Sequence, residues 1–107
     1  MNGFSEILQR VHDSAKQRRL FNPHALRQMA RPQRMITTSE VRKVIESGKI
    51  IEDYPHDPRG HSCLMFGFGD ENRPIHVACS PKEECLAIIT AYLPNNNEWE
   101  EDYERRI

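Results

Sequence analysis

Hydrophobic positions follow two different periods along the chain, and the period changes at Gly48. Before Gly48, apolar residues recur every three or four positions, which is typical of amphipathic helices. After it, four short apolar runs are separated by clusters of Gly, Pro, Asp and Asn, which is typical of strands joined by turns. The pattern therefore predicts helices followed by strands, an α+β fold.

Three helices are predicted ahead of the sheet. The first covers residues 4–18, where the apolar side chains share one face. The second begins at Asn22, because Asn is a favoured N-cap and the proline after it suits the first helical position; it should stop before Pro32. The third begins at the capping box that runs from Thr37 to Glu40, and it closes at the glycine where the period changes.

The apolar runs predict four strands. The turn G-D-E-N-R-P between the second and third runs suits an antiparallel hairpin, so we expect a four-stranded antiparallel sheet. One face of this sheet should pack on the helices, and the other is either partly open or covered by the C-terminal tail. The strands are expected at about residues 49–54, 62–68, 74–79 and 86–92.

Alternation along the last two strands assigns their side chains to faces. His76 lies on the face opposite the apolar stripe of its own strand. In the last strand, Thr90 and Tyr92 fall on the same face as Leu86 and Ile88. We therefore expect the two hydroxyl groups to be presented together on one face.

A chain of 107 residues has room for one domain with a small core, in keeping with its mean hydropathy of -0.75. We divide it into an N-terminal helical extension (1–21), a core (22–95) and a polar tail (96–107) that Trp99 anchors. No apolar run approaches the roughly 20 residues of a membrane span, and no secretory signal is visible. A cytoplasmic protein without a membrane partner is expected.

The net charge of -1 conceals an asymmetry between the two parts of the chain. Residues 1–49 hold ten Lys or Arg and four Asp or Glu, whereas residues 50–107 hold five and twelve. A basic helical part is compatible with an anionic partner such as RNA, and Arg31, Arg42 and Lys43 are the candidate contacts. The alternative is an ordinary solvated helix surface.

Three cysteines at irregular spacing argue against a disulfide framework. The simplest interpretation is that they are small buried hydrophobic residues. The competing interpretation is a tetrahedral zinc site, although no C-x-x-C pair is present. Its ligands would be His61, Cys63, Cys79 and Cys85. No other cofactor is expected.

Several motifs occur in a fixed order: G-K-I-I-E-D-Y-P, G-H-S-C-L-M-F-G, R-P-I-H-V and I-I-T-A-Y-x-P, followed by a tryptophan. Over roughly residues 24–103 this series resembles the bacterial domain of unknown function 4258 family. The chain departs from that family at Gln28, where an arginine is usual, and in the distance from His24 to the Ile-Thr pair. The family's order of helices and strands is similar to the RelE/ParE toxin fold, which implies a toxin-type, metal-independent ribonuclease with a cognate antitoxin.

Metal-independent RNA cleavage needs a base, an acid and cations around the phosphorus. Histidine suits the first two roles and arginine the third. Each candidate also has a plain structural explanation, so a non-catalytic protein-interaction module with structural histidines is the alternative. The candidate catalytic residues are His24, Arg27, Arg59, His76, Thr90 and Tyr92. Only their convergence on one cleft would support catalysis.

Overall fold

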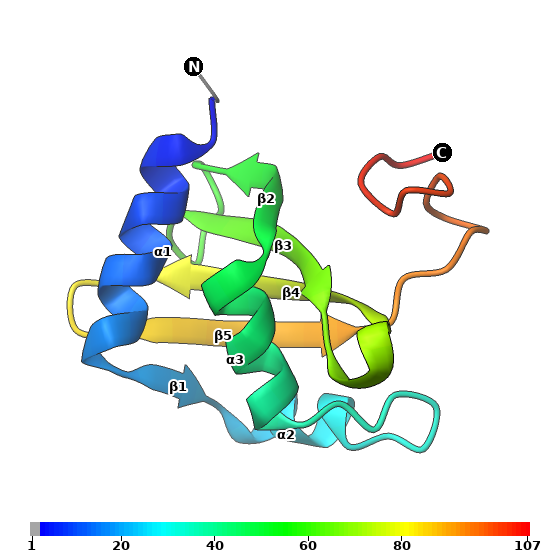
Figure 1. Ribbon diagram of the computed structural model, residues 1–107. Helices are drawn as coiled ribbons and strands as arrows, with labels where there is room; N and C mark the ends of the chain where they lie inside the picture. Colours follow the sequence, from blue (N-terminus) through cyan, green and yellow to red (C-terminus); the bar gives the residue numbers. More distant parts are fainter. Residues whose placement is uncertain (1–2) are drawn as a thin grey trace.

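The computed structural model describes residues 3–107 as helices packed on one face of a mixed five-stranded sheet (Figure 1). The α+β class is therefore confirmed. The elements, in chain order, are α1 (Ser5–Gln17), β1 (Arg19–Phe21), α2 (Pro23–Met29), α3 (Thr38–Ser47), β2 (Lys49–Tyr54), β3 (Ser62–Phe68), the 3-10 turn η1 (Asp70–Asn72), β4 (Pro74–Pro81) and β5 (Leu86–Tyr92).

The helices begin and end where their local chemistry predicts. The Asn22 side chain accepts a hydrogen bond from the Ala25 amide at 2.7 Å and so caps α2. Thr37 and Glu40 form the expected capping box at α3, with bonds of 3.1 and 3.2 Å. At the other end of α3, a Cβ on Gly48 would lie 2.4 Å from the Val44 carbonyl oxygen, so only glycine fits there.

The four predicted strands are confirmed, but the expectation of a purely antiparallel sheet is wrong. The strand order is β1-β5-β4-β3-β2, and β1 runs parallel to β5. Sequence patterning misses β1 because three residues, Arg19–Phe21, are too few to show alternation. The strand forms where the connection from α1 to α2 passes along the free edge of β5.

A β-bulge corrects the predicted faces of β5. Ala78 pairs with Thr90 but its neighbour Cys79 pairs with Ile88, so one residue of β5 has no partner. The extra residue reverses the alternation beyond it. Thr90 and Tyr92 therefore leave the face that carries Ile88 and share the face of His76, while Leu86, Ile88 and Ala91 belong to the core.

The core lies between the sheet and helices α1 and α3. Val11 from α1, Val44 from α3 and Val77 from β4 are fully buried in it. The opposite face of the sheet is covered by the tail, in which Trp99 is only 1% exposed. Within residues 3–107, no helix combines the length and apolar character needed to cross a membrane.

One buried ion pair joins the start of α3 to the turn between β3 and β4. Glu40 is 1% exposed, and its carboxylate accepts hydrogen bonds from Arg73 at 2.6 and 2.8 Å and from the Asp70 amide at 2.9 Å. Arg73 also donates to the backbone carbonyl groups of Arg34 and Met35, at 2.9 and 2.6 Å. Hydrogen bonding from Arg73 lowers the pKa of Glu40 from 4.5 to about 2.

Replacing Glu40 with Gln should lower the free energy of unfolding by about 3 kcal/mol at neutral pH, because Arg73 loses its buried counter-ion. The lowered pKa of Glu40 stabilises the folded protein above its usual value of 4.5, and this contribution is lost as the pH falls towards about 2. Urea unfolding at neutral and acidic pH should therefore show a difference between wild type and Glu40→Gln that shrinks with acidification.

The matched control is Glu46→Gln, which removes the same charge from an exposed position of the same helix. Its effect should stay within about 0.5 kcal/mol. Equal losses for both variants would show that the buried pair does not stabilise the fold.

Candidate functional site

Two of the predicted site residues meet on the outer face of the sheet. His76 and Tyr92 are paired residues of β4 and β5, and the Tyr92 hydroxyl lies 3.1 Å from Nδ1 of His76. Thr90 lies on the same face, two residues before Tyr92, and is paired with Ala78. The bulge in β5 produces this arrangement, which strict alternation did not predict.

Both ring nitrogens of His76 are already bonded. Nε2 lies 2.7 Å from the Tyr103 carbonyl oxygen, which can only accept, so Nε2 carries the proton. Nδ1 then accepts from the Tyr92 hydroxyl in the neutral ring. His76 is fully buried, and this burial lowers its pKa. Burial also raises the pKa of Tyr92 to about 12. The pair is held neutral and has no contact with solvent on the His76 side.

The C-terminal tail closes over this pair. The Trp99 ring packs edge-on against His76, with 4.4 Å between ring centroids. Arg106 stacks on Trp99 at 4.5 Å and donates two hydrogen bonds, of 2.8 and 3.1 Å, to Glu52 of β2. Burial acts to raise the pKa of Glu52, but hydrogen bonds from Arg106 and Tyr54 outweigh it and the pKa falls. Arg106 thus ties the tail to the sheet, together with the ion pair between Lys49 of β2 and Glu104 at 2.6 Å.

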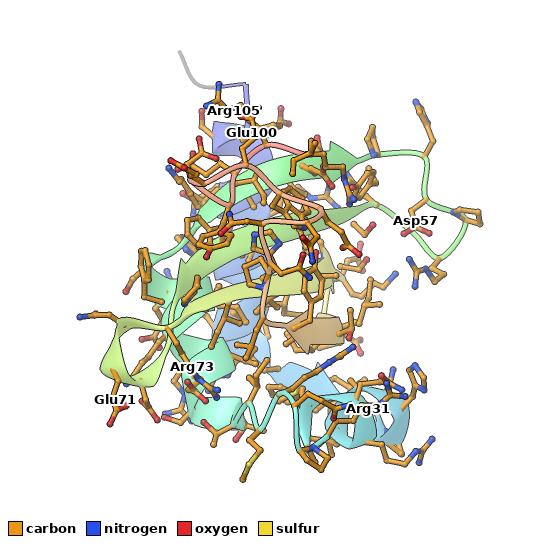
Figure 2. The ribbon with its side chains drawn as sticks, turned by 90° about the vertical axis from the view of Figure 1, so that its right-hand side faces the viewer. Arg31, Asp57, Glu71, Arg73, Glu100 and Arg105 are labelled. Atoms are coloured by element: carbon orange, nitrogen blue, oxygen red, sulfur yellow. The ribbon has the colours of Figure 1, made fainter. Side chains whose placement is uncertain are left out.

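The other predicted catalytic residues lie elsewhere. His24 and Arg27 are exposed on α2, and no hydrogen bond among the described residues joins either of them to His76. Arg59 lies in the β2–β3 loop, where it pairs with Asp57 at 3.0 Å. Figure 2 shows that Asp57 is well separated from Arg31, which lies just beyond the C-cap of α2. No single site containing all six residues is formed.

A basic edge runs along β1 and α2, at the bottom of Figure 1. Residues 14–39 contain six Lys or Arg and no Asp or Glu. The side chains of five of the six form no hydrogen bond or ion pair with residues 3–107, whereas Arg34 donates to the Ala91 carbonyl at 3.1 Å. We define the basic edge as Lys16, Arg18, Arg19, Arg27, Arg31 and Arg34. The uninterrupted basic stretch is visible in the sequence, but its contribution from β1 and the end of α1 was missed.

The remaining nucleic-acid candidates lie on α3. Lys43 forms an ion pair with Asp70 at 2.6 Å, which reduces its availability for a ligand. Arg42 is exposed. Neither residue belongs to the basic edge. Of the three predicted contacts, Arg31 is the one that does.

The proposed zinc set is corrected by the structure. Cys63 and Cys79 face each other across β3 and β4 with 3.8 Å between sulfur atoms, but both are buried in the core. His61 is bonded to Asp53 and Arg10 instead. Within the described range, residues 3–107, no group of three His, Cys, Asp or Glu side chains could hold a metal ion. A hydrogen bond with the Cys63 thiol, together with burial, raises the pKa of Cys79, which keeps it protonated.

The comparisons with known proteins establish the family. The family described as "Domain of unknown function (DUF4258)" matches residues 21–93, and the chain belongs to it. No curated protein and no solved structure matches the chain significantly. The matched segment includes α2, the strands β2 to β5 and the His76–Tyr92 pair. Helix α1 and the tail that covers His76 lie outside it.

Replacing Arg106 with Gln should loosen the tail, because it removes both the stacking on Trp99 and the bonds to Glu52. The loss should be about 1 kcal/mol, since Arg106 is partly solvated. Trp99 is the only tryptophan, so its fluorescence reports on the tail. Emission should shift to longer wavelength and acrylamide quenching should increase. The control Arg105→Gln removes an exposed cation that pairs only with Glu100 and Asp102, within the tail. Identical spectra for the two variants would contradict the role of Arg106.

Proposed function

We propose that this protein binds single-stranded RNA through the basic edge. The observation that carries the proposal is the segment of residues 14–39, which holds six cations and no carboxylate. Most of these cations have no partner among residues 3–107, so they can bind phosphate groups without first breaking ion pairs. Arginine is suited to this role because its guanidinium group binds phosphate oxygens in a bidentate manner.

The rest of the edge has features that suit an unpaired strand. Leu20 and Leu26 are exposed by 44% and 42% within the same segment, and they offer apolar surface to unstacked bases. His24 is exposed in the first turn of α2, where its ring can stack on a base. The C-terminal tail has the opposite charge to the basic edge: residues 96–107 hold five Asp or Glu and two Arg.

Binding without cleavage is the function that the geometry supports best. His76 is enclosed by the tail with both nitrogens occupied, and Arg59 is held by Asp57, so neither can reach a phosphate bound at the basic edge. The resemblance to RelE/ParE-type toxins implies an antitoxin partner. Within this proposal, such a partner would be a protein with an acidic surface that competes with RNA for the same cations.

The double variant Arg27→Gln/Arg31→Gln should weaken RNA binding. Binding is measured by fluorescence anisotropy with a short labelled oligoribonucleotide. The plot of log affinity against log salt concentration should become less steep by about 1.4, because each phosphate contact on a single strand contributes about 0.7 to the steepness. Affinity at physiological salt should drop about tenfold or more.

The control is the double variant Arg59→Gln/Arg105→Gln, which removes the same charge from positions outside the basic edge. Its affinity and salt slope should match those of the wild type. No measurable binding by the wild type at low salt, or an equal loss in both double variants, would overturn the proposal.

A further inference from the structure

We propose that Arg10, His61 and Lys82 form a binding site for a protonated oxyanion, a phosphate group that carries at least one hydroxyl. The site lies between α1, the β2–β3 loop and the turn after β4, where no part of the RNA proposal places a ligand. It is independent of the family assignment as well, because Arg10 lies outside the matched residues 21–93.

The hydrogen bonds around His61 fix its tautomer. Nδ1 lies 2.7 Å from Nη1 of Arg10, and a guanidinium group can only donate, so Nδ1 accepts and carries no proton. The proton is therefore on Nε2, which donates to the Asp53 carboxylate at 2.5 Å. Asp53 thus orients the ring so that the lone pair of Nδ1 points at Arg10. A ligand hydroxyl could take the place of Arg10 as the donor to Nδ1.

A hollow of about 480 Å³ opens beside this chain of three groups. Arg10, His61 and Lys82 are among the residues that line it. Lys82 is held in place because its Nζ donates to the Arg59 carbonyl at 2.7 Å, which leaves two of its three protons for a ligand. Gly60, at φ +105°, makes room for this ammonium group, since a Cβ there would lie 2.5 Å from Nζ.

The hydroxyl of Ser14 connects α1 to the turn after β4, beside the hollow. It donates to the Lys82 carbonyl at 2.6 Å and so ties the turn after β4 to α1. Arg10, His61 and Lys82 therefore line the same hollow from three segments that are tied to one another. Arg10 and Lys82 match the charge of an oxyanion, and Nδ1 of His61 matches a P–OH group.

Two carboxylates also line the hollow, and they narrow the choice of ligand. Asp13 and Glu83 repel a bare multivalent anion, but they can accept hydrogen bonds from further hydroxyl groups. The chemistry therefore favours inorganic phosphate, which keeps a hydroxyl at neutral pH, over sulfate and over the dianion of a phosphate monoester. Neither of these has a hydroxyl at neutral pH, so neither can replace Arg10 as the donor to Nδ1 of His61.

The test compares phosphate with sulfate on the full chain near neutral pH. Inorganic phosphate, phenyl phosphate and sulfate are titrated against the wild type, with isothermal calorimetry for affinity and NMR for the His61 ring. Inorganic phosphate should bind with Kd on the order of 1 mM, at least about tenfold tighter than sulfate or phenyl phosphate, and should shift the His61 Nδ1 resonance.

Two variants and a control locate the site. Arg10→Gln should weaken phosphate binding about tenfold, because it removes a charge-assisted contact. His61→Phe should remove the preference for phosphate over sulfate while leaving weak binding of both. Arg105→Gln, which removes an exposed cation of the tail outside both the hollow and the basic edge, should bind phosphate as the wild type does.

Equal affinity of the wild type for phosphate and sulfate would overturn the proposal even if His61→Phe fails to fold. An equal effect of Arg10→Gln and Arg105→Gln would do so as well, since it would indicate only diffuse electrostatic attraction to the protein. Loss of RNA binding in the basic-edge variant would leave this site intact, so the two proposals fail separately.

Discussion

The ion pair between Glu40 and Arg73 is the contact on which the arrangement of this molecule depends. It joins the N-terminus of α3, the turn between β3 and β4, and the segment between α2 and α3. Because Glu40 is buried, removing either partner would leave a charge without compensation, so the three segments are held in one arrangement. The carbonyl groups of Arg34 and Met35 are bonded to Arg73, and Arg34 in turn reaches β5. The loop between α2 and α3, which carries Arg31 and Arg34 of the basic edge, is thereby fixed against the sheet.

The outer face of the sheet shows how a chemically suggestive group becomes structural. His76 and Tyr92 would be an exposed donor–acceptor pair if the sheet ended the molecule. The tail instead supplies the Tyr103 carbonyl and the Trp99 ring, and these satisfy and bury His76. A satisfied, neutral imidazole in an aromatic enclosure stabilises the tail but has no free nitrogen for proton transfer. A functional role for His76 would require the tail to move away first.

The parts of the fold that local chemistry dictates could be predicted from the sequence. Asn22 and the Thr37–Glu40 box mark helix starts through side-chain bonds to nearby amides, so their effect is visible in a few residues. The parallel strand β1 could not be predicted, because it is defined by its partner β5 rather than by its own pattern. The bulge in β5 was likewise invisible, since a strand with an extra residue has the same composition as one without it.

The same distinction between local sequence and tertiary contacts applies to the candidate sites. Arg27 and Arg31 were predicted because they lie close together in the chain. The contacts of His61 with Asp53 and Arg10 were missed, because Arg10 lies 51 positions away and only tertiary packing brings it near. The convergence expected for His24, Arg59 and His76 failed for the same reason: residue type alone does not say which element faces which.

The charge distribution and the closed outer face support one central proposal: that RNA binds along β1 and α2 while His76 stays buried beneath the tail. The most direct measurement is NMR chemical-shift mapping of the labelled protein with a short single-stranded RNA. We expect amide shifts confined to the segment from the end of α1 to the loop before α3, with the Nε2 proton of His76 unchanged. Shifts centred on His76, Tyr92 and Trp99, with an unperturbed basic edge, would contradict it.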